Sequence, residues 1–245
     1  MIRKEIFLLI VFLTNIIQGI TGFAGTVLAM PPSVIDVGFN TAKPILNLLG
    51  ILAGIYVVAI SYKHIDKKEF FKCMGVMVVG IIAGIFLKSL FTGNANLLYK
   101  ILGCVVMLVG LSGVYKTFFK KSEAEKPHNP VVSYLLLISS GVVHGMFVCG
   151  GPLLVSYLTG KLKDKQTFRA TISAIWIVLN SIILVSDVRD GYFTRDTLIL
   201  AAMASVVLFI GMAVGNLLYK KMSRELFMKI TYVLLVISGA SLFVK

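Results

Sequence analysis

The sequence is poor in charge, and its acidic residues are scarcer than its basic ones. Only 14% of its 245 residues are charged, and 24 Lys and Arg stand against 11 Asp and Glu. In soluble domains about a quarter of the residues are charged, so the composition argues against a soluble globular protein.

A net charge of +13 would suggest a nucleic-acid partner in a soluble protein. Here Lys and Arg lie in short loops between apolar runs, where anionic headgroups attract them. We therefore expect a lipid bilayer and no nucleic acid as partner.

Cysteine is also scarce, and familiar catalytic motifs are missing. Cys73, Cys104 and Cys149 lie inside apolar segments, an odd set that fits neither a disulfide framework nor metal-ligand spacing. The sequence contains no HExxH, GxSxG or Walker A pattern. We therefore expect no enzyme, no cofactor and no metal site. Any transport must then run on gradients rather than on ATP.

Long uncharged runs are what the sequence has in abundance. Residues 44–60, 73–87 and 198–219 contain no charged side chain. About 20 such residues form a helix that crosses about 30 Å of hydrocarbon, and helices that are apolar all round need lipid or a much larger protein around them. The predicted fold class is therefore an all-α polytopic membrane protein. Eight apolar segments can be drawn, at 6–37, 41–62, 70–91, 96–119, 131–160, 166–187, 195–219 and 224–244.

A polar stretch, KKSEAEKPHNP at 120–130, divides the chain near its middle, which suggests an internal duplication. Sliding the halves by 126 positions matches Lys43 with Arg169. The same shift pairs Gln18 with His144, Gly19 with Gly145 and Asn47 with Ser173. We predict a first repeat at 1–119, a linker at 120–130 and a second repeat at 131–245, in one membrane domain. The first 25 residues resemble a signal peptide, but a related segment recurs at 131–160, so we expect them to belong to the mature protein.

Two matching segments are interrupted by glycines and proline. Segment 6–37 would be about 48 Å long as one helix, too long for one crossing without strong tilt. Pro31–Pro32 is expected to disrupt its second part. It either crosses once as a broken helix or enters and leaves by the same side. With segments 6–37 and 131–160 both re-entrant, about twice as many Lys and Arg fall on one side as on the other, which favours the second geometry. Three crossings per repeat then predict inverted repeats.

A helix break offers free N–H groups and the positive end of a helix dipole, which suits an anion. Glycines would allow close approach of a ligand, and Lys43 and Arg169 would add charge, although such cations also snorkel to headgroups. His144 is a candidate carrier of a coupling proton, or else a neutral hydrogen-bonded histidine. Asn180 is interpreted as a helix–helix contact and Asp187 as a solvated residue at a segment edge.

The interrupted segments read QGITGFAGTVLAMPP and HGMFVCGGPLLVSYLTG, and each precedes a helix that a basic residue opens. They resemble the sulfite exporter TauE/SafE family, also called TSUP. The first copy is looser, because Phe23 and Ala24 stand where a second glycine is frequent. The resemblance implies a secondary transporter of sulfite, sulfonates or other small organic acids in a bacterial or archaeal cytoplasmic membrane. It also implies that residues 18–26 and 144–152 line the pathway, near Lys43 and Arg169.

The predicted function is secondary active transport of a small anion by alternating access around the two broken helices, with protons as a candidate coupling ion. An uncoupled anion channel and a non-transporting membrane scaffold are the alternatives, and the oligomeric state, a homodimer included, is left open. The predicted substrate-binding residues come from both broken segments and the helices after them. They are Gln18, Gly19, Thr21, Gly22, Gly25, Thr26, Lys43, Asn47, His144, Gly145, Cys149, Gly150, Gly151, Pro152, Ser156, Arg169 and Ser173.

Overall fold

The computed structural model describes residues 4–90, 95–119, 129–162, 164–219 and 224–241, and within these ranges it is all helical, without strands. This confirms the predicted all-α class. The predicted linker at 120–130 falls almost wholly outside the described residues. The helices are α1 Lys4–Thr21, α2 Ala24–Val37, α3 Phe39–Ser61, the short 3-10 helix η1 Tyr62–His64, α4 Lys67–Leu90, α5 Ala95–Phe119, α6 Pro130–Phe147, α7 Gly151–Thr159, α8 Lys165–Arg189, α9 Arg195–Tyr219 and α10 Arg224–Ser241.

Five helical segments of the described chain are long and apolar enough to cross a bilayer. They are α3 with η1, α4, α6, α8 and α9. The surface they present is strongly apolar, with large side chains such as Phe71, Phe86 and Val206 more than 60% exposed. Exposed apolar side chains of this size are stable in lipid and not in water. The architecture is therefore that of a multi-pass membrane protein.

Both interrupted segments are helical hairpins. A Cβ built on Gly25 of α2 would lie 3.0 Å from the carbonyl oxygen of Thr14 in α1. Along one continuous helix these residues would be about 16 Å apart, so the chain turns back at Gly22–Phe23. Gly150 lies against the carbonyl of Ser140 in the same way. The two breaks predicted from the glycines are therefore present, and each is a reversal of direction.

One residue with left-handed backbone makes each reversal. Gly22 has φ 81° and Val148 has φ 57°, and they are 126 positions apart, the offset that matches the halves. Left-handed backbone costs a β-branched residue more than it costs glycine. Val148 therefore holds a strained conformation that its surroundings impose.

Pro31 and Pro32 do not interrupt α2, contrary to the prediction. The helix runs without a break from Ala24 to Val37. Each proline removes one helical hydrogen bond and clashes with the preceding turn, at about 3 kcal/mol. Met30 and Val34 on either side are completely buried. Their packing, and that of the rest of α2, offsets the cost and keeps the helix intact.

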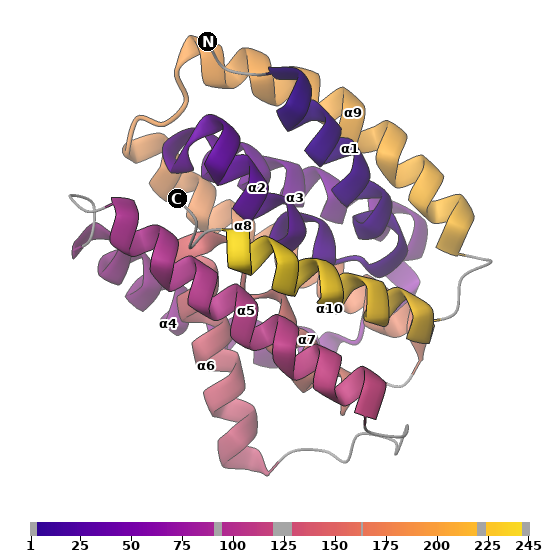
Figure 1. Cartoon of the computed structure of the whole chain (residues 1–245). Coiled ribbons are helices and arrows are strands. Elements are labelled where there is room, and N and C mark those ends of the chain that lie inside the picture. The colour runs from indigo at the N-terminus through magenta and orange to yellow at the C-terminus, as the bar shows by residue number, and fades with distance from the viewer. Residues whose placement is uncertain (1–3, 91–94, 120–128, 163, 220–223, 242–245) are drawn as a thin grey trace.

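The most extensive helix contacts pair α1 with α9, α4 with α6, α5 with α10 and α3 with α8. Figure 1 shows α1 running beside α9 and α5 beside α10. Each helix of the first half has a counterpart in the second: α1 corresponds to α6, α3 to α8, α4 to α9 and α5 to α10. This set of pairs stays the same when every helix is replaced by its counterpart. A two-fold relation between two repeats would produce such a pairing. The pairing supports the predicted duplication.

Glycines allow two of these pairs to pack backbone to backbone. Gly84 of α4 lies against α6, and its Cα would be 3.2 Å from a Cβ built on Gly145 of that helix. Gly215 of α9 and Gly19 of α1 face each other in the same manner. Small residues in G-x-x-x-G spacing are typical of such close helix contacts. Gly19 and Gly145, both predicted to bind substrate, therefore lie in helix contacts.

Candidate functional site

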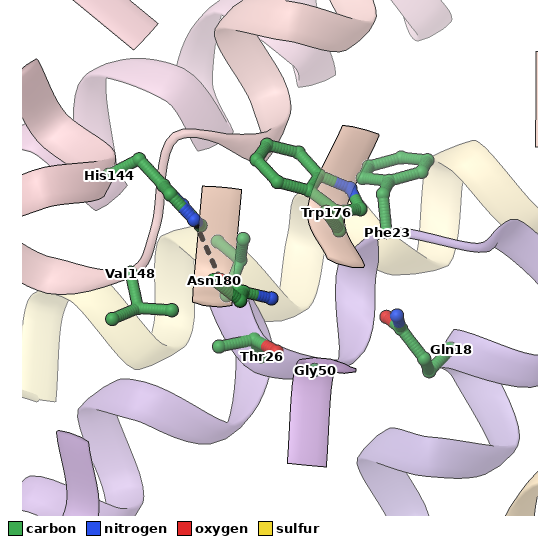
Figure 2. Close-up of a pocket in the computed structure, with 10 residues that line it drawn as sticks. Gln18, Phe23, Thr26, Gly50, His144, Val148, Trp176 and Asn180 are labelled. Carbon is green, nitrogen blue, oxygen red and sulfur yellow. Dashed lines mark hydrogen bonds between the residues drawn. The ribbon is translucent and has the colours of Figure 1, made fainter. Parts of the chain in front are cut away.

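A small pocket lies where the two hairpin turns meet (Figure 2). A Cβ built on Gly151, at the start of α7, would lie 3.3 Å from Val27 Cγ2 and 3.5 Å from the ring of Phe23. The turn of each hairpin thus touches the other. The pocket is lined by Gln18, Phe23, Thr26, Val27, Gly50, His144, Val148, Gly151, Trp176 and Asn180.

His144 is the titratable group among the lining residues. Its Nε2 lies 2.8 Å from Asn180 Oδ1, and its ring centroid is 4.6 Å from that of Trp176. With the amide oxygen as acceptor, Nε2 carries the proton and Nδ1 is left as the acceptor. Nδ1 has no hydrogen-bond partner among the described residues. A buried acceptor of this kind is available to a proton or to a donor on a ligand.

The position of Asn180 depends on Gly50 of α3. A Cβ built on Gly50 would lie 2.5 Å from Asn180 Nδ2, closer than a real Cβ tolerates. Only glycine therefore lets α3 approach α8 here and admits the amide that holds His144. Asn180, expected to be a helix–helix contact, does bridge helices, and it also lines the pocket.

Side chains of α1 occupy the free amides at the start of α2. The N–H of Gly25 donates to Gln18 Oε1 at 2.7 Å. The N–H groups of Phe23 and Ala24 donate to Thr21 Oγ1 at 3.4 Å and 3.3 Å. The expectation that this break leaves open donors is wrong for this conformation. Buried N–H groups without a partner are costly, so the protein fills the site itself when no ligand does.

Lys43 forms a buried ion pair with Asp187. The two side chains are 1% and 0% exposed. Asn47 Nδ2 also donates to Asp187 Oδ2 at 3.4 Å and to the carbonyl of Asn180 at 3.1 Å. The prediction that Asp187 is solvated is therefore wrong, because the end of α8 is buried against the start of α3. A carboxylate in an apolar segment is a functional candidate by default, and that rule would have found it.

Arg169 is buried without such a partner. It is 7% exposed, its Nη1 donates to Asn216 Oδ1 at 3.2 Å, and its guanidinium lies 4.6 Å from the ring centroid of Tyr219. Within the described ranges, Nε and Nη2 have no hydrogen-bond partner, and neither does Ser173 Oγ. A Cβ built on Gly22 would lie 3.0 Å from Ser173 Oγ and 3.2 Å from Arg169 Cγ. Both side chains therefore lie at the first hairpin turn.

Comparison with known proteins decides the family. The profile of the sulfite exporter TauE/SafE family matches residues 7–242, nearly the whole chain. The chain belongs to this family. A curated relative, the probable inner membrane transporter protein TsaS of Comamonas testosteroni, is 29% identical over 103 residues. That alignment covers 42% of this chain and 43% of the relative, so it spans less than half of either protein.

Family membership confirms the resemblance noted in the two glycine-rich segments. It also agrees with a multi-pass protein of the cell membrane and with a member of a transporter family rather than an enzyme. Of the predicted residues of this TauE/SafE protein, Gln18, Thr26, His144 and Gly151 line the pocket. Cys149 and Gly150 form the second turn and are buried, as is Pro152 in the first turn of α7, and Ser156 is half-buried on that helix.

Four residues line the pocket without having been predicted to do so: Val27, Gly50, Trp176 and Asn180. A helical pattern in α8 could have found Trp176, because Arg169, Ser173, Trp176 and Asn180 are spaced by three or four residues. Such spacing places side chains on one face of a helix. The sequence alone did not show that this face meets the two hairpin turns.

Proposed function

We propose that this protein is a secondary active transporter of a small sulfur-containing anion and works by alternating access around its two helical hairpins. The observation that carries the proposal is the pocket between the hairpin turns, to which both halves of the chain contribute. The family of sulfite exporters and the relative named as a transporter support the class of substrate and activity.

The pocket is too small for a sulfonate in this conformation, which fits a substrate-free step of such a cycle. The space within the pocket admits only water-sized molecules. Gln18 holds the amide of Gly25, and Asn180 holds His144. An entering anion would displace the Gln18 carbonyl and accept hydrogen bonds from the start of α2, where the helix dipole also favours negative charge. Movement of the first hairpin away from α7 would open room for it.

The two hairpins support re-entrant segments and inverted repeats. Each chain reversal returns the chain alongside itself, as a segment that enters and leaves by one side must do. Rocking of one repeat against the other would then expose the pocket to each side in turn. His144, whose Nδ1 accepts nothing from the described residues, is the proposed proton carrier for coupling.

Uptake into proteoliposomes tests the proposal. The probe is labelled 4-toluenesulfonate, which stays ionised, with an imposed pH gradient and protein-free liposomes as control. We expect accumulation above the external concentration, abolished by a protonophore. Equilibration without accumulation would instead show an uncoupled channel, and no uptake of any sulfonate or sulfite would indicate a scaffold. His144→Gln should lose accumulation while Arg195→Gln, an exposed cation at the start of α9, keeps it.

A further inference from the structure

The two matched cations, Lys43 of α3 and Arg169 of α8, lie in different electrostatic surroundings. Lys43 has a carboxylate partner in Asp187, whereas Arg169 has the neutral Asn216 and the ring of Tyr219. We infer that Arg169 binds the negative charge of the transported anion, and that Lys43 is neutralised within the protein and carries no substrate charge. This assignment rests on the proposed function.

The sequence shows how the difference arises. The shift of 126 positions that matches Lys43 with Arg169 matches Asp187 with Ser61. Ser61 is neutral, and its hydroxyl donates to the carbonyl of Val57 at 2.6 Å. α3 and α8 pack against each other. A carboxylate at the end of α8 therefore serves the cation at the start of α3, and the reciprocal position holds none.

The residues that follow the G-x-x-x-G pairs in α4 and α9 show the same difference in charge between the two halves. Lys88 follows Gly84 by four residues and pairs with Asp190 at 3.1 Å. The fourth residue after Gly215 is Tyr219, which covers the guanidinium of Arg169 with its ring. Carboxylates thus pair with Lys43 and Lys88, whereas Arg169 shares the ring of Tyr219 with a second cation, Lys165, whose Nζ lies 3.5 Å from the ring centroid. A buried cation without an anion is costly, because water no longer compensates its charge.

The unpartnered atoms around Arg169 fit an oxyanion. Nε and Nη2 are two donors of one planar guanidinium, and such a pair binds two oxygens of the same group. Ser173 Oγ adds a hydroxyl without a partner among the described residues. The aromatic face of Tyr219 offsets only part of the positive charge. A sulfonate or sulfite group would supply both the missing charge and the missing acceptors.

The position of Arg169 along α8 indicates a route to the pocket. Arg169, Ser173, Trp176, Asn180 and Asp187 share one face of the helix. Arg169 precedes Asn180 by about 16 Å of helix, and Asp187 closes the opposite end through its ion pair with Lys43. An anion held by Arg169 therefore reaches the pocket from the side of the first hairpin.

Asn216→Asp is the decisive variant, because it places a carboxylate where the amide oxygen already contacts Arg169. Binding of 4-toluenesulfonate and of sulfite to the purified full-length protein in detergent is measured by calorimetry and by thermal shift. We expect Asn216→Asp to weaken binding at least about tenfold while melting, without anion, at or above the wild-type temperature. Arg169→Gln should weaken binding similarly. Arg189→Gln removes the same charge from the exposed end of α8 and should leave the Kd within about twofold.

The other outcomes contradict either the assignment of Arg169 or the proposed function itself. Wild-type affinity in Asn216→Asp and Arg169→Gln, in a protein that binds and accumulates the anion, overturns the assignment and leaves the proposed function standing. Loss of binding in Lys43→Gln/Asp187→Asn, with retention in Asn216→Asp, assigns the anion to Lys43 instead. A wild-type protein that neither binds nor accumulates sulfonate or sulfite overturns the proposed function, and the assignment falls with it.

Discussion

The buried pair Lys43–Asp187 offers the sharpest test of the electrostatics of this fold. The two side chains are 1% and 0% exposed, so water screens neither charge. Removing one partner of a buried pair costs about 3–5 kcal/mol, because the other charge stays buried alone. Asp187→Asn conserves the shape and can still accept the hydrogen bond from Asn47. We expect it to lower the free energy of unfolding by about 3–5 kcal/mol.

The double variant Lys43→Met/Asp187→Leu separates charge from packing. Replacing both partners of a buried pair by apolar groups is often neutral or stabilising, so most of the loss should be recovered. Unfolding in mixed micelles with increasing SDS gives the free energies. The exposed pair Lys229–Glu225 on α10 is the control, and Glu225→Gln should change unfolding little. A cost below about 1 kcal/mol for Asp187→Asn, the range of exposed pairs, would refute the reasoning.

Three further predictions concern the hairpins and the helix contacts. Gly22→Ala should destabilise the protein by about 1–2 kcal/mol, because φ is 81° and Ser173 Oγ lies 3.0 Å from the new Cβ. Val148→Gly should instead relieve backbone strain at the second turn. Thermal melts of both variants check this. Gly84→Ala should cost about 1–3 kcal/mol because its Cβ would overlap the carbonyl of Val142, and Gly75→Ala in the same helix, with open space around it, should be neutral or stabilising in the same melts. Asn180→Leu should cost about 1–3 kcal/mol and abolish accumulation of 4-toluenesulfonate in proteoliposomes, and normal uptake would contradict its place in the pocket.

The helices and the two breaks could be predicted because they depend on local sequence. Uncharged runs indicate membrane helices whatever their neighbours are. Glycines that recur at one offset mark the turns, and Gly22 does take left-handed backbone. The prediction that Pro31 and Pro32 disrupt α2 was wrong, because the general effect of proline on a helix takes no account of burial. The packing of α2 against its neighbours outweighs their cost, and that packing is a property of the tertiary structure.

The site could be predicted only in part, because its polar contacts join residues far apart in the chain. Asp187 looked like an edge residue until the fold buried it against Lys43. Gln18 was expected to contact a ligand, yet its amide caps α2. His144 lines the pocket, as proposed from its position before the second break. Composition and spacing thus identified the segments that border the pocket, and the pairing of α3 with α8 decided which side chains meet.

The proposed mechanism explains why the halves agree in backbone and differ in side chains. Alternating access by repeat exchange needs two hairpins that can adopt each other's conformation, and left-handed backbone at Gly22 and Val148 provides matching turns. Two unpaired cations at matching positions would instead attract two anions or leave one charge uncompensated in every state. Asp187, matched by the neutral Ser61, removes one of them. A symmetric scaffold with one neutralised cation is thereby suited to carry one anion in each cycle.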